Sequence, residues 1–213
     1  MAGRWRETSP TELAEWLVHV PVAWAFAGGW GLDLWAEQQS RSHSDIEIAC
    51  LRGNLRALID ALPGFEVAVA QNKQLSPWPA DALPTPPFSL WLQRHGETLW
   101  DFEIVAEAHE GQTWRYRRDE RITLPLDRLF RHIGDGRMVV APEVQLLYKC
   151  KEPRDKDVAD LQRFAPMLDP AANAWLREAV AAAHPEAIAH LQDSQVASDS
   201  SAVSLGGAIR ISS

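Results

Sequence analysis

The feature that most constrains the fold is a change in sequence pattern near Ala141. Before this point, short apolar runs are separated by turn-forming Gly and Pro residues, as is typical of strands alternating with short helices. After it, apolar residues recur at helical spacing, beginning with a helix that Pro142 is suited to open. The pattern therefore predicts a mixed α/β region up to about residue 140, followed by a helical part.

Within the first region the patterns predict a definite order of elements. A β-hairpin is indicated by two β-rich runs on either side of His95-Gly96. Five of the fourteen prolines fall within residues 76–87, which favours a loop there. The expected helices cover residues 9–19, 29–37 and 54–62, and the expected strands cover 22–27, 45–51, 65–70, 88–93, 98–106 and 113–117.

The second region is expected to contain helices that begin near Pro142, Pro153 and Pro170. From about Ser194 the chain is rich in Ser, Ala and Gly, which favours a loose tail. The predicted organisation is a catalytic domain over residues 1–140, a helical subdomain over 141–193 and a tail over 194–213. No internal repeat is visible.

Composition places limits on the function. The chain of 213 residues is 46% hydrophobic, has no run long enough for a membrane helix and lacks a signal-peptide pattern, so a cytoplasmic protein without membrane contact is expected. Cys50 and Cys150 are expected to be reduced and buried. The net charge of −8 argues weakly against nucleic acid as a partner and is compatible with a cationic substrate.

Two predicted strands carry alternating carboxylates. Asp45 and Glu47 share one face of the first strand, and Asp101 and Glu103 share one face of the second. A half-exposed strand explains either pattern alone. If the two strands are neighbours, however, three or four carboxylates converge, and their repulsion is costly unless a cation compensates it. Oxygen ligands of this kind suit Mg²⁺.

The pair Gly28-Gly29 supplies a second feature. It stands at the end of a predicted strand and the start of a predicted helix, where backbone N–H groups can approach an anion. A tight turn alone also explains such a pair. Followed by a helix and a carboxylate-bearing strand, the pair favours nucleotidyl transfer, in which metal ions bridge carboxylates and a triphosphate.

The segment GGWGLDLWAEQQSRSHSDIEIA resembles the signature of the nucleotidyltransferase superfamily, in the branch of aminoglycoside and lincosamide adenylyltransferases. That branch shows Gly-Gly-Trp, a following Leu/Ile-Asp, and Arg-x-His-x-Asp-hydrophobic-Asp/Glu. The segments WRYRRDERITLPL and APEVQLLYKCKEPRDKDVADLQRFAPML also resemble the branch. The resemblance covers roughly residues 16–184. It implies a nucleotidyltransferase-type mixed β-sheet with flanking helices, followed by a helical C-terminal part.

The resemblance also implies catalytic roles. Asp45 and Glu47 would hold the metal ions, although Glu47 is longer than the aspartate often found there. Asp101 would be the third carboxylate, as a metal ligand or as the base for the acceptor hydroxyl. Glu103 competes for the role of base because it shares the face of Asp101.

Other residues would bind the nucleotide. Gly28 and Gly29 would hold phosphates, Arg41 would reach a phosphate or form a salt bridge from its loop, and Lys149 could meet the triphosphate. His43 is expected to orient the loop, and Asp33 to be structural. A further expectation is a polar network that joins the C-terminal helices to the sheet, made by Lys156, Asp157 and Asp160.

The resemblance implies a Mg²⁺-dependent enzyme, with two metal ions, that moves NMP from an NTP to a hydroxyl of a small molecule. AMP from ATP is the expected group, and an aminoglycoside-like, cationic acceptor is compatible with the acidic composition. One alternative is a nucleotide-binding or regulatory protein of the same fold without turnover, such as a toxin–antitoxin partner. A protein- or RNA-directed transferase is a third. The nucleobase, the acceptor and the oligomeric state stay open.

Overall fold

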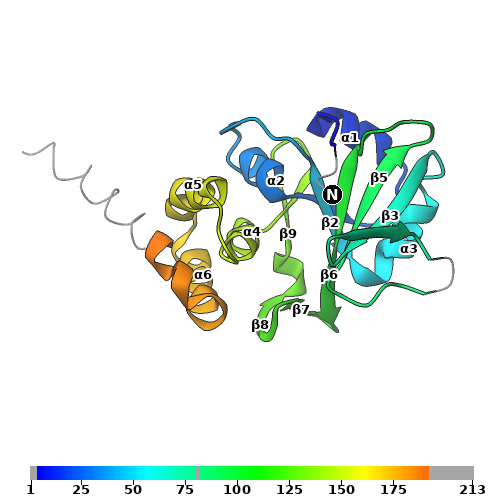
Figure 1. The fold of residues 1–213 in the computed structure, drawn as a ribbon. Coiled ribbons are helices and arrows are strands. Elements are labelled where there is room, and N and C mark those ends of the chain that lie inside the picture. Colours follow the sequence, from blue (N-terminus) through cyan, green and yellow to red (C-terminus); the bar gives the residue numbers. More distant parts are fainter. Residues whose placement is uncertain (1–3, 80–81, 192–213) are drawn as a thin grey trace, which may run out of the picture. The chain divides into compact units, whose positions relative to one another are not determined.

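The computed structural model describes residues 4–79 and 82–191. The chain forms two compact units, Met1–Gln145 and Leu146–Ser213, and the boundary between them falls within helix α4 (Pro142–Lys149). The predicted division at residue 140 lies shortly before this helix. The predicted tail over 194–213 lies outside the described residues. Figure 1 shows the order of the elements along the chain.

The first unit contains a mixed sheet that, within the described residues, has ten strands. Eight of them follow the order β4-β3-β5-β6-β2-β1-β10-β9, and β7 pairs with both β6 and β8. The strands are β1 (Trp24–Ala27), β2 (Glu47–Leu51), β3 (Phe65–Gln71), β4 (Gln74–Pro77), β5 (Ser89–Arg94), β6 (Phe102–Glu110), β7 (Thr113–Tyr116), β8 (Asp119–Pro125), β9 (Phe130–His132) and β10 (Met138–Val140). The predicted mixed α/β class is confirmed.

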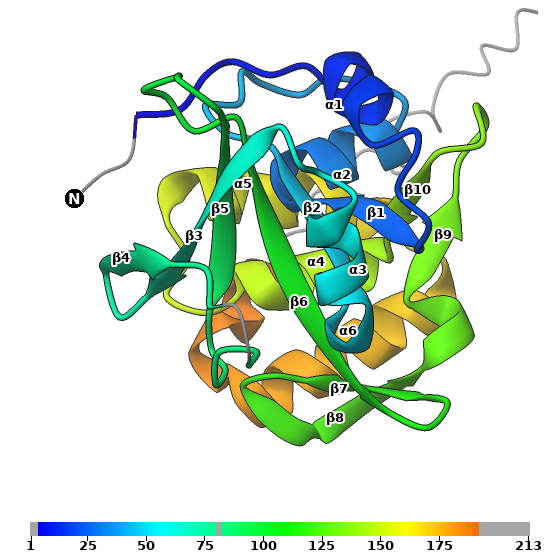
Figure 2. The same ribbon diagram turned by 90° about the vertical axis from the view of Figure 1, so that its right-hand side faces the viewer.

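Alternate residues of the central strands face opposite sides of the sheet. Ile48 of β2, Ile104 of β6 and Leu90 of β5 lie side by side in register, and all three are fully buried. Leucines of α1 (Pro10–Trp16) and α3 (Leu55–Asp60) belong to the same hydrophobic core, so these helices cover that face. Figure 2 shows α3 beside β2 and β6. The neighbouring positions of β2, β5 and β6 therefore face the other side.

Helix α2 (Gly28–Trp35) follows β1 without an intervening loop and packs against β1, β2 and β10. Its first residue, Gly28, has φ +62°, a conformation that glycine adopts without strain. Gly31 also has no room for a side chain, because an added Cβ would lie 2.8 Å from the Phe26 carbonyl oxygen. The glycines thus allow a tight passage from strand to helix.

The sequence patterns predicted most elements but missed several strands. The hairpin of β5 and β6 is antiparallel, as expected. In contrast, β4 enters the predicted loop over 76–87, and β8, β9 and β10 were not predicted. Strands β9 and β10 have only three residues each, and such strands are too short for an alternation pattern to be detected.

The described part of the second unit is helical, as predicted, with α5 (Asp155–Phe164) and α6 (Pro170–Ala183) after the end of α4. Asp169 caps α6 through a hydrogen bond from the Ala172 N–H to its side chain. Among the described residues, no helix combines the length and apolar character that crossing a membrane requires.

Candidate active site

Three carboxylates meet on the sheet face opposite the main core. Glu47 of β2 and Glu103 of β6 are register partners in a parallel pair, so their side chains extend on the same face. Asp45 precedes β2 by two residues. One oxygen from each of Asp45, Glu47 and Glu103 lies within 4.8 Å of the others, and all three residues are half-buried. These three residues are called the acid cluster below.

The acid cluster is electrostatically strained without a cation. Burial is the largest cause that raises the pKa of Glu103 to about 8, and the negative charges of Glu47 and Asp45 contribute in the same direction. A hydrogen bond with Ser89 and the charge of Arg117 act against this shift. Near neutral pH the three carboxylates of the acid cluster therefore hold a proton among them, unless another positive charge takes the place of that proton.

The two predicted phosphate-binding glycines lie beside the acid cluster. A Cβ added to Gly28 would lie 2.6 Å from Oε2 of Glu47, and a Cβ added to Gly29 would lie 2.5 Å from Cε1 of His43 and 2.6 Å from Nη2 of Arg41. Any larger residue would displace these side chains. The structure therefore brings Gly28, Gly29 and Arg41 close to Glu47, and their predicted contact with phosphates stays a prediction.

The amide of Gly28 has a protein partner that the sequence did not reveal. Its N–H donates to Oε1 of Gln145 over 2.5 Å, and Gln145 is buried in α4. Gln145 lies 117 positions away in sequence and occupies a variable position of the Pro-Glu-x-x-Leu-Leu-Tyr-Lys motif, so no sequence signal identified it. The Gly28 N–H thus already donates to Gln145. The role that the structure supports for Gly28 is that its missing side chain lets other groups come close to the backbone.

His43 is held by Asp33 on the other side of Gly29. Nε2 of His43 lies 2.6 Å from Oδ2 of Asp33, and both side chains are almost fully buried. The Ser40 N–H also donates to Oδ2 of Asp33, and the Trp30 ring lies over the His43 ring at 4.6 Å. These contacts agree with the expected loop-orienting role of His43 and the structural role of Asp33.

Asp101 lies apart from the acid cluster. Its Oδ2 accepts a hydrogen bond from the Arg94 N–H at 2.8 Å, and its Oδ1 lies 3.3 Å from Nη2 of Arg94 and 3.7 Å from Nη1 of Arg6. The side chain is 1% exposed. Asp101 directly precedes β6, which begins at Phe102, and its carboxylate pairs with Arg94 and Arg6, so the expected convergence with Glu103 does not form. The structure brings Glu103, and not Asp101, to Asp45 and Glu47.

Lys149 lies in the second unit. Its Nζ is 2.8 Å from Asp160 and 3.5 Å from Asp157. Lys149 thus pairs with two of the acids expected, together with Lys156, in a polar network that joins the C-terminal helices to the sheet, and that network stays a prediction. The predicted contact of Lys149 with a triphosphate stays a prediction.

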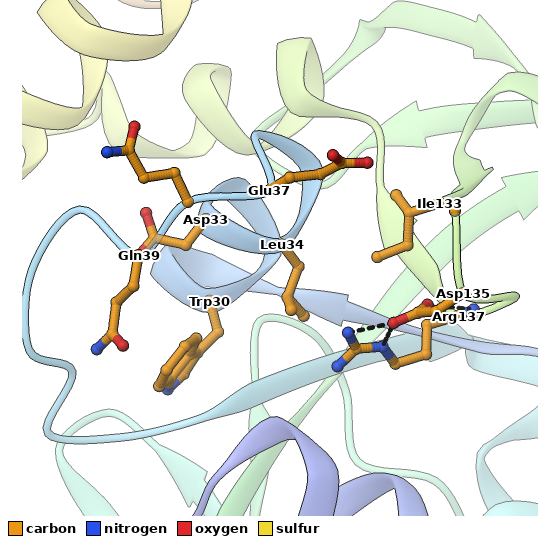
Figure 3. Close-up of a pocket in the computed structure, with 10 residues that line it drawn as sticks. Trp30, Asp33, Leu34, Glu37, Gln39, Ile133, Asp135 and Arg137 are labelled. Carbon is orange, nitrogen blue, oxygen red and sulfur yellow. Dashed lines mark hydrogen bonds and ion pairs between the residues drawn. The ribbon is translucent and has the colours of Figure 1, made fainter.

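A separate pocket of about 600 Å³ lies between the end of α2 and the loop joining β9 to β10, and Figure 3 shows its lining side chains. Trp30, Asp33 and Glu37 contribute from α2 and the residues after it. Asp135 and Arg137, on the other side, form an ion pair with each other. Asp45, Glu47 and Glu103 do not line this pocket. The pocket is therefore separate from the acid cluster.

The acid cluster fits a divalent cation. Its donors are carboxylate oxygens, which Mg²⁺ prefers, and burial together with the close approach of these oxygens raises the pKa of Glu103. A bound cation would relieve the mutual repulsion that the geometry imposes. Asp45, Glu47 and Glu103 are therefore the residues suited to hold the metal.

Comparison with known families supports the resemblance found in the sequence. The family model of aminoglycoside-2''-adenylyltransferases matches residues 11–77. This segment contains Gly28, Gly29, Arg41, Asp45 and Glu47. The match confirms the predicted resemblance to this branch of the nucleotidyltransferases and supports the prediction of an enzyme of that type. No curated protein matches the chain.

Three solved structures show distant similarity. A lincomycin-bound lincosamide antibiotic adenylyltransferase, LnuA, is 19% identical over 73% of this chain and 95% of its own, with a TM-score of 0.49. ANT(2'')-Ia in complex with adenylyl-2''-tobramycin is 11% identical over 88% and 95%, with a TM-score of 0.41. A nucleotidyltransferase-like antigen of Paracoccidioides brasiliensis is 18% identical over 84% and 88%, with a TM-score of 0.43. Similarity at this level carries no argument about function.

Proposed function

We propose that the protein is a Mg²⁺-dependent nucleotidyltransferase that moves NMP, with ATP as the expected donor, to a hydroxyl of a small molecule. The observation that carries this proposal is the meeting of Asp45, Glu47 and Glu103 beside Gly28-Gly29. Two of the three acids and both glycines lie in the segment that matches an adenylyltransferase family. The antibiotic class of that family makes an antibiotic the first acceptor to test.

In the proposed reaction, the acceptor hydroxyl oxygen forms a bond to the α-phosphorus, and the bond from that phosphorus to the pyrophosphate oxygen breaks. Mg²⁺ held by the acid cluster would supply charge neutralisation for the phosphates. Glu103 is the proposed base that receives the hydroxyl proton, because its carboxylate lies in the acid cluster, whereas Asp101 pairs with Arg94 and Arg6. This assignment gives Glu103 the role for which the sequence had left Asp101 and Glu103 in competition.

The glycine turn and its loop would position the nucleotide. Gly28 and Gly29 carry no side chains and allow phosphates to approach the backbone. Arg41, whose guanidinium lies against Gly29, would contact a phosphate oxygen. The Asp33–His43 pair would hold the loop that carries Arg41 and Asp45.

The test is pyrophosphate release from each NTP with Mg²⁺, in the presence of aminoglycosides, lincosamides and other polyols. We expect one acceptor to stimulate release, and we expect Asp45→Asn to lose this stimulation. Thermal unfolding of the variant controls for its folding. If no acceptor raises release above the Asp45→Asn background while ATP still binds, the non-catalytic alternative replaces the proposal.

A further inference from the structure

A second pocket of about 760 Å³ opens on the sheet face that carries the acid cluster. It is lined by the β3–β4 hairpin, by Ser89 and Trp91 of β5, and by Glu103 of β6. Figure 2 shows the hairpin next to β5 at one side of the sheet. All of these elements belong to the first unit.

The pocket and the acid cluster share Glu103. Trp91 of β5 is the register partner of Glu103, and Glu103 is in turn the register partner of Glu47. The three side chains therefore form a row across one face of the sheet. A molecule that packs against Trp91 therefore lies next to Glu103, which is the residue proposed to take a hydroxyl proton.

The lining of the pocket has a distinctive chemistry. Trp91 provides an aromatic surface and is held by edge contacts with Trp5 at 4.8 Å and Trp100 at 5.7 Å. Leu75, on β4, is 44% exposed and is one of the few large apolar side chains exposed within the described residues. An exposed leucine and an aromatic ring in the lining of one pocket favour a ligand with an apolar face.

The charges in the pocket limit the ligand further. Among the described residues that line the pocket, Lys73 of the hairpin turn is the cation and Glu103 is the acid. Of these residues, a polycation would meet Lys73 and would find a carboxylate only in Glu103, which belongs to the acid cluster. The acidic composition of the whole chain, which suggested a cationic acceptor, is therefore not repeated in this pocket.

We propose that this pocket is the acceptor site, and that its ligand is a hydroxylated small molecule with an apolar face and at most one positive charge. This inference rests on the proposed function. Trp91 and Leu75 hold the apolar face, Lys73 excludes polycations, and Glu103 meets the reacting hydroxyl.

Calorimetric titration tests the pocket without turnover. The probes are alkyl-substituted glycosides that are neutral or carry one amine, compared with polycationic aminoglycosides. We expect members of the first group to bind the wild-type protein and Leu75→Arg to weaken this binding about tenfold or more, because it removes apolar contact and adds charge. Val18→Arg changes another exposed apolar residue (67% exposed) and should leave the binding unaltered.

A charge reversal tests the selectivity separately. Lys73 is exposed in a turn, so Lys73→Glu should leave the fold intact and raise the affinity for polycations about fivefold relative to neutral glycosides. The inference is overturned if no neutral or singly charged probe binds, if polycations bind the wild type more tightly, or if Leu75→Arg has no effect.

Turnover distinguishes the two proposals. If a probe binds in a way that depends on Leu75 but no NTP gives pyrophosphate release, the nucleotidyl transfer is contradicted and the proposed ligand pocket stands. If turnover occurs and Leu75→Arg leaves the KM for the acceptor unchanged, the proposed transferase activity stands and the assignment of this pocket as the acceptor site is rejected. With both proposals correct, the variant raises the KM for the acceptor and leaves the KM for ATP unchanged.

Discussion

Asp101 and Glu103 stand two residues apart and look alike in the sequence, yet they lie in opposite surroundings. Asp101 is almost fully buried and is surrounded by Arg94 and Arg6, which compensate its charge. Glu103 faces Glu47 and Asp45, which oppose its ionisation. A carboxylate whose charge is already compensated stabilises the fold, whereas one held among like charges is ready to bind a cation or a proton.

The largest expected effect separates the two residues by activity. Glu103→Gln should reduce the rate of nucleotidyl transfer about 100-fold or more, because it removes both the proposed base and a metal ligand. Asp101→Asn should keep the rate within about threefold, because that side chain contacts arginines outside the acid cluster. The measurement is kcat for acceptor-dependent pyrophosphate release. The reverse pattern would restore Asp101 as the third catalytic carboxylate.

The next effect separates the two residues by stability. Asp101→Asn should lower the free energy of unfolding by about 2 kcal/mol, because the buried pairing with Arg94 loses its charge. Arg94 and Arg6 are about one-third exposed, which limits the loss. Urea unfolding measures this difference. An unchanged midpoint in Asp101→Asn would contradict the structural role.

A substitution at Gly28 tests whether the position of the Glu47 carboxylate matters for metal binding by the acid cluster. Gly28→Ala should weaken Mg²⁺ binding about tenfold, because the new methyl group would displace the Glu47 carboxylate from its place. Gly96→Ala is the matched control, since Gly96 also has positive φ (+81°) but has open space around it. Both variants share the backbone strain, so only the contact with Glu47 distinguishes them. Calorimetry with Mg²⁺ measures the affinity, and equal affinities in the two variants would refute the close approach.

The smallest expected effect is a pH dependence of stability in the absence of metal. The pKa of Glu103 is raised from 4.5 to about 8 in the folded chain, so the folded chain binds more protons than the unfolded chain between these values. The free energy of unfolding therefore falls as the pH rises through this window, and Glu103→Gln should make the fall shallower.

Urea unfolding of the wild type and of Glu103→Gln at pH 5.5 and pH 8 with a chelator measures this effect. The variant should be the more stable of the two at pH 8, where the wild type carries the repelling charge. Identical pH dependence in the two proteins would show that the acid cluster does not hold Glu103 in its protonated form. Mg²⁺ should reduce the wild type's dependence, because the cation replaces the proton.

Local patterns determined a large part of this protein. The Ile-rich alternation of β2 specified a strand with one buried face, and Gly28-Gly29 specified a tight passage into a helix. The change near residue 141 marked the start of helical structure. These features depend on neighbours within a few residues, and short-range periodicity and backbone sterics record them in the sequence.

Only the tertiary structure decided which side chains meet. The register between β2 and β6 paired Glu47 with Glu103, and the start of β6 at Phe102 left Asp101 among arginines. The contact of Gly28 with Gln145 likewise joins residues that are 117 positions apart. Strand register and strand ends are set by the packing of the whole sheet, and Asp101 and Glu103 fit the same alternation, so alternation alone could not choose between the two acids.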